Sequence, residues 1–459
     1  MKKKLAITAT LITVALLSLW LVQYNFFKTP KNDETYVGVA YGGNSVAEGK
    51  LLIDRVKDYT NLFVLQSGTL QRDLKSVDEL GDYAVSQGLF FLPYFGHYLE
   101  STFSAWLEEA AQRWGNRFLG VYYADEPGGK MLDDYVEFED AATGEVIMKT
   151  RYGDIAVYKS NGVVIHYEIG GVIHLYEPTN ATTDSSTGNG AIDETESSVY
   201  ATFYPNGTIS GEISNRSSYK TYGQLMSVRP FKDADEAAER FLAREQTSIE
   251  FLKNHSANVF TADYALYWFD YLAGYDVLLA QVGWNHTLNQ QIAQVRGAAK
   301  LQNKDWGIII TWKYDRPPYL DSGAEILSQM RTAYEAGAKY LVLFNYYEGE
   351  NSPYGTMKDE HFQALQDFWN NVAQNPQVMR GSVNADAVLV LPKNYGWGMR
   401  YSEDKIWGIF KPDAKTQQLW DLMQTALETH GSKLDIVYED AQFPLPSEYQ
   451  SVYRWTQNN

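Results

Sequence analysis

The stretch FLGVYYADEPGG, Phe118–Gly129, carries the strongest signal for both the fold and the chemistry of this chain. An apolar, aromatic-rich run ends abruptly in Asp125, Glu126 and Pro127, and a Gly-Gly turn follows. This pattern predicts a buried parallel strand that delivers two adjacent carboxylates to its C-terminal end. Active sites of α/β barrels are built at that end of the strands. Paired carboxylates there suggest acid/base chemistry on a glycosidic bond.

Short apolar runs alternate with amphipathic helical patterns on both sides of this stretch, which predicts βαβ units and a parallel sheet. Eight strand–helix pairs are what a closed (β/α)8 TIM barrel needs, here over residues 35–376. An open doubly wound sheet is the competing fold, and the count favours the barrel. The predicted strands are Tyr36–Tyr41, Leu62–Gln66, Leu89–Tyr94, Phe118–Tyr123, Val259–Asp263, Val277–Gln281, Trp306–Trp312 and Tyr340–Asn345.

The alternation of strands and helices stops between residues 131 and 227. Here apolar and polar residues alternate, as is typical of antiparallel strands. Asn-Gly at 161–162 and 206–207 and Gly-Gly at 170–171 are typical hairpin turns. We therefore expect a β-rich insertion after the fourth strand, at the rim of the barrel mouth.

A smaller unit follows Pro376, over residues 384–459. Its predicted strands are Ala387–Leu391, Leu434–Tyr438 and Ser451–Trp455, with the helix Thr416–His430 among them. This pattern predicts a compact C-terminal α/β domain packed on the barrel. The motif YGWGMR, Tyr395–Arg400, either caps the barrel or sends side chains toward it.

The N-terminus has the features of a membrane segment. Three lysines at positions 2–4 precede the apolar run Leu5–Val22, which is long enough to cross a bilayer of roughly 30 Å as a helix. No small-x-small cleavage site follows, which favours an uncleaved anchor over residues 1–27 rather than a removed signal peptide. Because the lysines should stay on the cytoplasmic side of the membrane, we expect a single-pass protein of the cell membrane whose catalytic domain is extracytoplasmic.

Composition excludes several classes of function. The net charge of −18 over 459 residues argues against a nucleic-acid partner. The chain has no cysteine, so disulfides, thiolate metal sites and a Cys nucleophile are excluded. The seven histidines show neither HExxH nor clustered ligand spacing, so we expect no catalytic metal and no cofactor.

Polar and aromatic residues gather at the predicted strand ends. Sugar sites combine a few carboxylates and hydrogen-bonding groups with stacking rings, and this composition points to a carbohydrate substrate. The candidates for substrate binding are Tyr41, Tyr94, His97, Tyr123, Trp284, Trp312 and Tyr346.

The motif GVYYADEP resembles the fourth-strand motif of barrel glycoside hydrolases. The largest clan of these has Asn-Glu-Pro at this point, where the Glu is the acid/base, and it also needs a nucleophilic Glu at the end of strand seven. Here Asp125 replaces the Asn, and the predicted strand seven ends in TWKYD, residues 311–315, without a Glu.

Some barrel hexosaminidases are a closer match, because they carry an adjacent Asp-Glu pair at the end of strand four. In them the 2-acetamido oxygen of the substrate is the nucleophile, an exception to the scheme of two catalytic carboxylates. This resemblance implies that Asp125 orients and polarises the amide and that Glu126 is the general acid and then the base.

A third arrangement pairs Glu126 with a distant carboxylate, for which Asp263 and Glu348 are best placed. A separation of about 5 Å would imply retention, and one of roughly 6.5–9.5 Å would imply inversion. Glu126 is the acid in every version. The sequence therefore predicts a glycoside hydrolase that acts on surface or extracellular glycans. The alternative is a non-catalytic carbohydrate-binding protein of the cell surface on a degenerate barrel.

Overall fold

The computed structural model describes most of the chain from Glu34 to Trp455. The predicted membrane anchor, residues 1–27, lies outside the described residues. Within the part that is described, no helix is long and apolar enough to cross a membrane. The undescribed internal positions are 97–102, 134–135, 141–145, 151–154, 159–163, 168–172, 179–197, 204–208, 215–232, 256, 284–286, 315 and 347–351.

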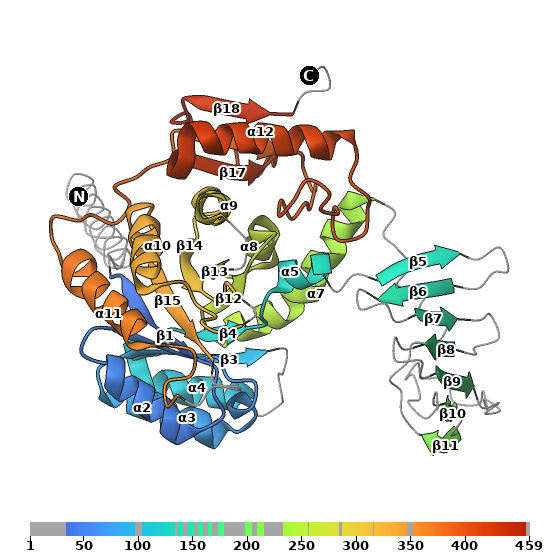
Figure 1. Ribbon diagram of the computed structural model, residues 1–459, viewed down its shortest axis with the longest axis horizontal. Coiled ribbons are helices and arrows are strands. Elements are labelled where there is room, and N and C mark those ends of the chain that lie inside the picture. Colours follow the sequence, from blue (N-terminus) through green and yellow to red (C-terminus); the bar gives the residue numbers. More distant parts are fainter. Residues whose placement is uncertain are drawn as a thin grey trace, which may run out of the picture.

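Eight parallel strands close into a barrel in the order β1-β15-β14-β13-β12-β4-β3-β2 (Figure 1). The closed barrel confirms the predicted (β/α)8 architecture. The open doubly wound sheet is excluded, because the eight strands form a closed ring in which each one pairs with two neighbours and none lies at an edge. The strands are β1 Tyr36–Tyr41, β2 Leu62–Leu65, β3 Phe90–Gly96, β4 Val121–Tyr123, β12 Val259–Asp263, β13 Val277–Val282, β14 Asp305–Ile310 and β15 Tyr340–Asn345.

Helices surround the barrel, and several begin at a side chain that caps the first turn. The Asp233 carboxylate accepts the Glu236 N–H as the N-cap of α7, and Ser322 with Glu325 forms a capping box. The helices are α2 Val46–Val56, α3 Leu74–Ser86, α4 Phe103–Trp114, α5 Pro127–Asp133, α7 Ala234–Asn254, α8 Tyr267–Ala273, α9 Leu288–Leu301, α10 Gly323–Glu335 and α11 Asp359–Phe368. Shorter 3₁₀ or π turns are Leu70–Arg72, Gly115–Arg117, Trp369–Ala373 and Gly431–Lys433.

Successive residues of each barrel strand face alternately the barrel interior and the helices. The inward side chains form one apolar cluster, and the outward ones pack with the helices in another. At the N-terminal end of the barrel the ring of Tyr36 stacks on Tyr340 at 4.8 Å, and Phe90 meets Tyr36 edge-on at 4.9 Å. Aromatic rings therefore fill the barrel interior at its floor, and a ligand site is expected at the C-terminal mouth.

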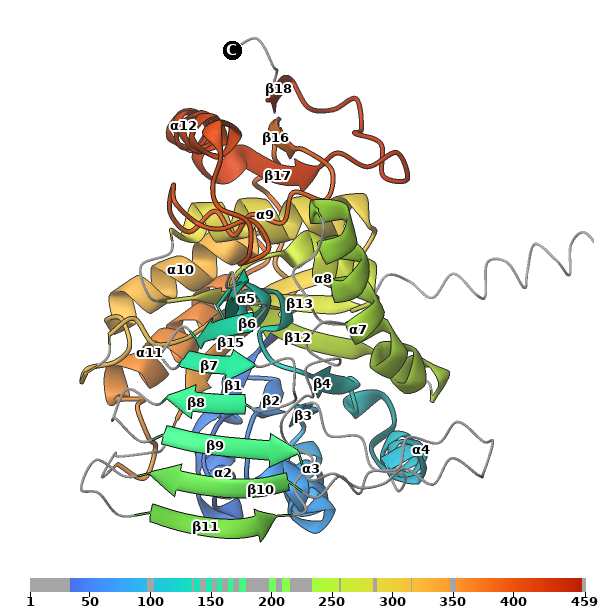
Figure 2. The same ribbon diagram turned by 90° about the vertical axis from the view of Figure 1, so that its right-hand side faces the viewer.

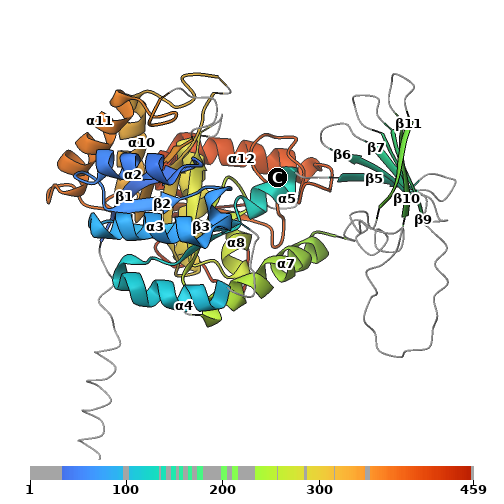
Figure 3. The same ribbon diagram turned by 90° about the horizontal axis from the view of Figure 1, so that it is seen from below.

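Between α5 and α7 lies the predicted β-rich insertion, a seven-stranded antiparallel sheet in the order β11-β10-β9-β8-β7-β6-β5. Figure 2 shows its strands alternating in direction, and Figure 3 shows the sheet beside the barrel, on the side of α5 and α7. The pairs β7–β8, β8–β9 and β10–β11 flank the three predicted hairpin turns, which lie outside the described residues. The strands are β5 Val136–Asp140, β6 Val146–Thr150, β7 Ile155–Tyr158, β8 Val164–Tyr167, β9 Ile173–Pro178, β10 Ser198–Phe203 and β11 Ile209–Ser214.

The C-terminal part forms a small parallel sheet in the order β17-β16-β18, with α12 packed against it (Figure 1). This unit sits on α9, where Arg296 Nε donates to Asp435 Oδ1 at 2.7 Å in a nearly water-free ion pair. Its elements are β16 Ala387–Leu391, α12 Ala414–His430, β17 Leu434–Tyr438 and β18 Ser451–Arg454.

The motif Tyr395–Arg400 contacts the helices around the barrel rather than the barrel mouth. The Arg400 guanidinium pairs with Asp133 at the end of α5 at 2.6 Å. Nearby, the fully buried Trp407 packs against Phe269 of α8, with 4.6 Å between ring centroids. The C-terminal domain therefore holds the helix that begins directly after Glu126.

Candidate active site

Inward-facing positions at the C-terminal ends of the strands form a polar layer above the apolar interior. The same alternation that buries Leu62 and Val64 brings Gln66 inward, and the alternation along β13 brings Gln281 inward. Together with side chains of β14, β15 and the turn after β4, these residues enclose a cavity of about 170 Å³, the mouth cavity. It is lined by Gln66, Asp125, Glu126, Gln281, Ile309, Thr311, Trp312 and Phe344.

The two carboxylates lie on a strained turn between β4 and α5. Ala124 and Glu126 have φ angles of 53° and 58°, in the left-handed region that L-residues seldom adopt. Neighbouring strands hold this turn in place, because the Ala124 N–H donates to the Gly96 carbonyl at 3.0 Å and the Glu126 N–H to the Ala262 carbonyl at 2.8 Å. Backbone strain that is fixed in this way is common at functional sites.

Two sequence expectations about this turn are wrong in detail. β4 begins at Val121 rather than at Phe118, because Gly120 has a φ of 129° that interrupts the strand. Gly128 and Gly129 form the first turn of α5 rather than a loop turn. A Cβ on Gly129 would come within 2.2 Å of the Tyr264 ring, so the close approach of that ring requires glycine.

Asp125 is held on the side of the barrel interior. The Tyr122 hydroxyl donates to Asp125 Oδ1, and Gln66 Nε2 donates to the Tyr122 oxygen at 3.2 Å and approaches Asp125 Oδ1 at 3.5 Å. Burial and the adjacent Glu126 carboxylate raise the pKa of Asp125 to about 7, against the lowering effects of Tyr122 and Lys130. Near neutral pH, Asp125 therefore retains a proton that an exposed aspartate would have lost.

Glu126 points toward the next strands of the mouth. Gln281 Nε2 donates to Glu126 Oε1 at 2.8 Å, and Lys130 Nζ lies 3.9 Å from Oε2. Its side chain is 27% exposed, so the carboxylate is positioned and yet reachable by a ligand.

Aromatic rings form one wall of the mouth cavity. The rings of Trp312 and Tyr346 lie 5.1 Å apart, and that of Phe344 stacks against Tyr346. Within the described residues, the indole N–H of Trp312 and the side-chain oxygen of Gln66 are buried without a hydrogen-bond partner. Buried polar groups are normally satisfied, so both are available to the hydroxyl or amide groups of a ligand.

The structure brings together part of the predicted site. Asp125, Glu126 and Trp312 line the mouth cavity, and Tyr346 packs on Trp312. Tyr94 packs edge-on against Tyr122, and burial together with the charges of the two carboxylates raises the pKa of its hydroxyl. His97, Trp284 and Glu348 lie outside the described residues.

Three predicted site residues face the helices instead of the mouth cavity. Tyr41 is fully buried, and its hydroxyl donates to the Ser45 carbonyl at 2.6 Å at the start of α2. Tyr123 is buried in the same outer layer, as is Asp263 at the end of β12. All three occupy outward positions in the alternation of their strands.

Asp263 acts as a cap for α5. Its Oδ2 accepts the Gly128 N–H at 2.6 Å, while Oδ1 accepts the N–H groups of Gly129 at 2.9 Å and of Tyr264 at 2.7 Å. A carboxylate at a helix N-terminus satisfies donors that have no partner within the helix. Asp263 therefore fixes the start of α5 and with it the direction of Glu126.

Gln66 and Gln281 are polar residues at the predicted strand ends, but neither they nor Tyr122 is among the candidate site residues. The alternation of inward and outward positions could have identified these three residues, because each lies at an inward position of its strand or directly after it. The candidates were instead chosen by residue type, which favoured tyrosines and carboxylates.

Comparisons with known proteins give distant structural matches. No protein-family model matches the chain, and no curated protein matches it. Among solved structures, GH5_18 from Streptomyces cattleya in complex with GlcNAc is 10% identical with a TM-score of 0.45, and 92% of this chain and 98% of that chain are covered.

Two other solved structures match less well. The cellulose synthase subunit Z of Clostridioides difficile is 11% identical with a TM-score of 0.35, covering 72% of this chain and 99% of that chain. Pyruvate kinase of Cryptosporidium parvum is 9% identical with a TM-score of 0.27, covering 94% and 90%. Because every TM-score is below 0.5, the activities of these proteins do not transfer to this chain.

Proposed function

We propose that this protein is a glycoside hydrolase in which Glu126 is the general acid and base. The observation that carries the proposal is the adjacent pair Asp125–Glu126 in a cavity at the C-terminal mouth of a closed barrel, beside the exposed edge of an aromatic wall. Glu126 is held by Gln281 on one oxygen and remains accessible, as a group that transfers a proton to a bound ligand must be.

The substrate-assisted scheme agrees best with the described residues. Among them, the mouth cavity contains no carboxylate besides Asp125 and Glu126, and Asp263 is occupied in capping α5. In this scheme, the acetamido oxygen of the substrate attacks its own anomeric carbon while Glu126 protonates the departing oxygen. Glu126 then removes a proton from the water that opens the cyclic intermediate. Asp125 accepts the amide N–H.

The raised pKa of Asp125 is compatible with this division of roles. Without a ligand, the buried Asp125 favours its protonated form. When the amide N–H of a substrate donates to Asp125, the carboxylate form is stabilised, so an N-acetylated sugar would favour the form of Asp125 that the scheme needs.

The test is hydrolysis of matched aryl glycosides with and without a 2-acetamido group. We expect turnover of the N-acetylated members and a large loss in Asp125→Asn on those substrates. Equal activity of wild type and Asp125→Asn on N-acetylated glycosides would eliminate the substrate-assisted scheme.

Activity on N-acetylated substrates should rise as the pH rises through about 7. The pKa of Asp125 is raised to about 7, so this residue is protonated below that pH and accepts the amide N–H of the substrate as a carboxylate above it. The free energy of unfolding should decrease between about pH 4 and 7, because the folded-state pKa of Asp125 lies above the unfolded value of about 3.9. A profile of kcat/KM against pH measures the first effect, and urea unfolding at several pH values measures the second. An unchanged kcat/KM between pH 5 and 8 would contradict the role of Asp125.

Trp312→Ala should raise KM by about tenfold and change kcat less, since the ring forms a wall of the cavity and about 1.4 kcal/mol of lost contact corresponds to that factor. Steady-state kinetics on one substrate measure both constants. Tyr314→Ala is the matched control, because this ring is 44% exposed on the same loop and does not line the cavity. Equal effects of the two substitutions would rule out a sugar-stacking role for Trp312.

The alternative, a non-catalytic carbohydrate-binding protein, is favoured by the same lack of a second catalytic carboxylate among the described lining residues. It predicts glycan binding that survives Glu126→Gln and no turnover. We also propose, from the N-terminal apolar run, that the barrel is anchored outside the cell membrane and acts on surface or extracellular glycans. Recovery of the full chain from the soluble fraction would contradict the anchor.

A further inference from the structure

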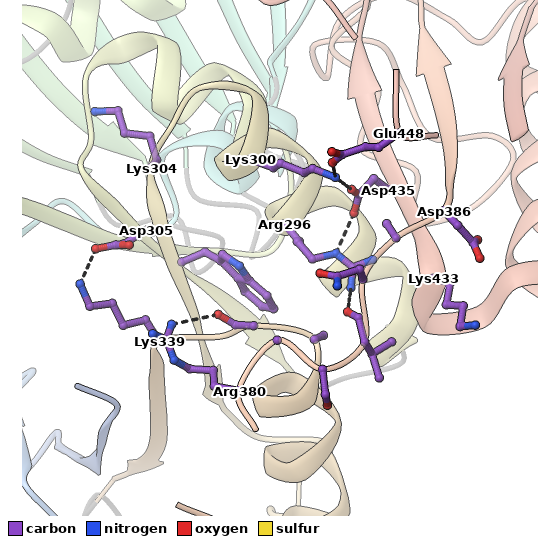
Figure 4. Close-up of a pocket in the computed structure, with 18 of the residues that line it drawn as sticks. Arg296, Lys300, Lys304, Asp305, Lys339, Arg380, Asp386, Lys433, Asp435 and Glu448 are labelled. Atoms are coloured by element: carbon purple, nitrogen blue, oxygen red, sulfur yellow. Dashed lines mark hydrogen bonds and ion pairs between the residues drawn. The ribbon is translucent and has the colours of Figure 1, made fainter. Parts of the chain in front are cut away.

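A cavity between the barrel floor and the C-terminal domain shows how this protein compensates charges that it withdraws from water (Figure 4). This floor cavity has a volume of about 930 Å³, and Arg296 on its wall is paired with the fully buried Asp435 at 2.7 Å. Lys339 Nζ, also on the wall, lies 2.6 Å from Asp305 Oδ2. A buried carboxyl group that lacks such a partner needs a physical explanation.

Asp270, on α8, is a carboxyl group of this kind. Its side chain is fully buried, and neither of its carboxyl oxygens has a hydrogen-bond donor among the described residues. It lies within hydrogen-bonding range of the carboxyl group of Asp263, which caps α5. Two carboxylates are both acceptors, so this contact becomes a hydrogen bond only if one of the two groups carries a proton.

The contact between these two acids is part of a closely packed junction of β12, α5 and α8. The Tyr267 hydroxyl, at the start of α8, donates to the backbone carbonyl of Asp263 at 3.0 Å. A Cβ on Gly128 of α5 would lie 2.8 Å from the Leu266 Cβ, so α5 and the start of α8 approach each other closely. On another side, α8 packs against α7. These elements shield the carboxyl group of Asp270 from water.

The charged groups that face Asp270 leave an excess of negative charge. Of these groups, Asp263 and Glu245 are acidic and Arg244 is basic. Arg244 Nε donates to one oxygen of the buried Glu245 at 2.7 Å, so its charge is already used to compensate Glu245. The other titratable groups around Asp270 are tyrosines that stay neutral, because burial raises the pKa of their hydroxyls well above the usual range: Tyr267, Tyr271 and Tyr275.

A proton on Asp270 compensates this excess. Among the residues that the structure describes, no three acidic or histidine side chains are arranged to hold a metal ion. Asp263 accepts four backbone N–H groups, at the start of α5 and directly after β12, and such donors stabilise its carboxylate form. Burial and the charges of Asp263 and Glu245 raise the pKa of Asp270, and only the charge of Arg244 opposes them. Of the two acids in contact, Asp270 is therefore the one that carries the proton.

We propose that Asp270 is a positioning residue, which as a neutral acid donates a hydrogen bond to Asp263 and so fixes the carboxylate that caps α5 and orients Glu126. A hydrogen bond from a hydroxyl to a carboxylate is roughly twice as strong as one between neutral groups. The bond from Asp270 therefore adds to the backbone donors in holding the direction of the Asp263 carboxylate. The orientation of Glu126 rests on the proposed function, whereas the bond itself does not.

The first test is urea unfolding of the full chain, in a neutral detergent, at pH values from 5 to 7. The unfolded chain has already released the proton of Asp270 in this range, while the folded protein keeps it, so the unfolding equilibrium constant of the wild type rises with pH. The Asp270→Asn variant keeps a donor and has no proton to release. We expect the wild-type constant, divided by that of Asp270→Asn, to rise about tenfold per pH unit until the folded-state pKa of Asp270 is reached.

Asp58→Asn is the control for this measurement, because Asp58 is exposed to water in the folded protein as well as in the unfolded chain. The corresponding ratio for Asp58→Asn should stay constant between pH 5 and 7. A ratio for Asp270→Asn that also stays constant would overturn the proposal, because Asp270 would then be ionised in the folded protein and could not donate to Asp263.

The second test separates the orientation of Glu126 from stability alone. Asp270→Leu has a similar volume and no donor, whereas Asp270→Asn retains one. With both variants shown by melting curves to be folded in the assay, kcat should fall at least about tenfold in Asp270→Leu, with KM little changed, and stay near the wild-type value in Asp270→Asn. Equal kcat values in the two variants would remove the positioning role.

The two tests also distinguish this inference from the proposed function. A wild type without turnover on any glycoside would refute the proposed function and with it the orientation of a catalytic Glu126. The pH dependence of unfolding would still decide whether Asp270 donates to Asp263, and it does so as well if Asp270→Leu fails to fold.

Discussion

Glu126→Gln should lower kcat by about 10²–10⁴-fold on substrates with poor leaving groups, the usual contribution of a general acid and base. The substitution is close to isosteric, and the Gln oxygen can still accept the bond from Gln281. The ion pair with Lys130, at 3.9 Å and partly exposed, contributes little to stability. We therefore expect the melting temperature to stay near the wild-type value while turnover collapses.

Leaving-group dependence separates an acid from a residue that only binds. A dinitrophenyl leaving group departs without protonation, so Glu126→Gln should retain far more activity on dinitrophenyl glycosides than on alkyl glycosides. Glu109→Gln, an exposed position on α4, serves as the control and should behave as wild type. A uniform loss across all leaving groups would argue against proton donation by Glu126.

Asp263→Asn should reduce both stability and activity, because Asp263 holds the start of α5. An Asn oxygen can replace Oδ1, but its amide group would face the Gly128 N–H that now donates to Oδ2. A buried donor without a partner costs about 1–3 kcal/mol. Displacement of Glu126 by about 1 Å would lower kcat by up to about 100-fold. Urea unfolding and steady-state kinetics measure the two effects.

This result distinguishes a cap from a catalytic carboxylate. If Asp263 were the partner of Glu126 in the chemistry, Asp263→Asn would abolish turnover and leave folding nearly unchanged. As a cap, its substitution should lower the free energy of unfolding and reduce turnover without abolishing it, since Asp125 and Glu126 are intact. Asp233→Ala is the control, because it removes the side-chain N-cap of α7 and should affect stability without affecting kcat.

The fold could be predicted from the sequence because apolar residues are spaced differently in the strands and in the helices. The predicted strands Tyr36–Tyr41, Val259–Asp263 and Tyr340–Asn345 match the observed bounds. The start of the fourth strand was harder to predict. The apolar run continues through Gly120, and the sequence does not show that the backbone of Gly120 leaves the strand conformation.

The candidate site was predicted only in part, because residue type was weighed more than strand register. Tyr41, Tyr123 and Asp263 are chemically plausible ligands of a sugar, yet each lies on the outward register and packs toward the helices. Gln66 and Gln281 lie on the inward register. The alternation of buried residues along each strand carries this information.

Other features depend on tertiary contacts that a single sequence does not reveal. The bond between Gln281 and Glu126 joins residues 155 positions apart. Burial and the Glu126 charge set the raised pKa of Asp125, and both require the folded barrel. The floor cavity is likewise formed by segments from the barrel and from the C-terminal domain.

The most direct test of the central claim is product release from a panel of aryl glycosides and N-acetylated glycans, by the wild-type chain and by Glu126→Gln in parallel. Our account predicts turnover of at least the N-acetylated substrates by the wild type, with glycan binding retained and turnover lost in Glu126→Gln. No turnover of any substrate by the wild type, with equal glycan binding by both proteins, would contradict it and identify the barrel as a carbohydrate-binding protein.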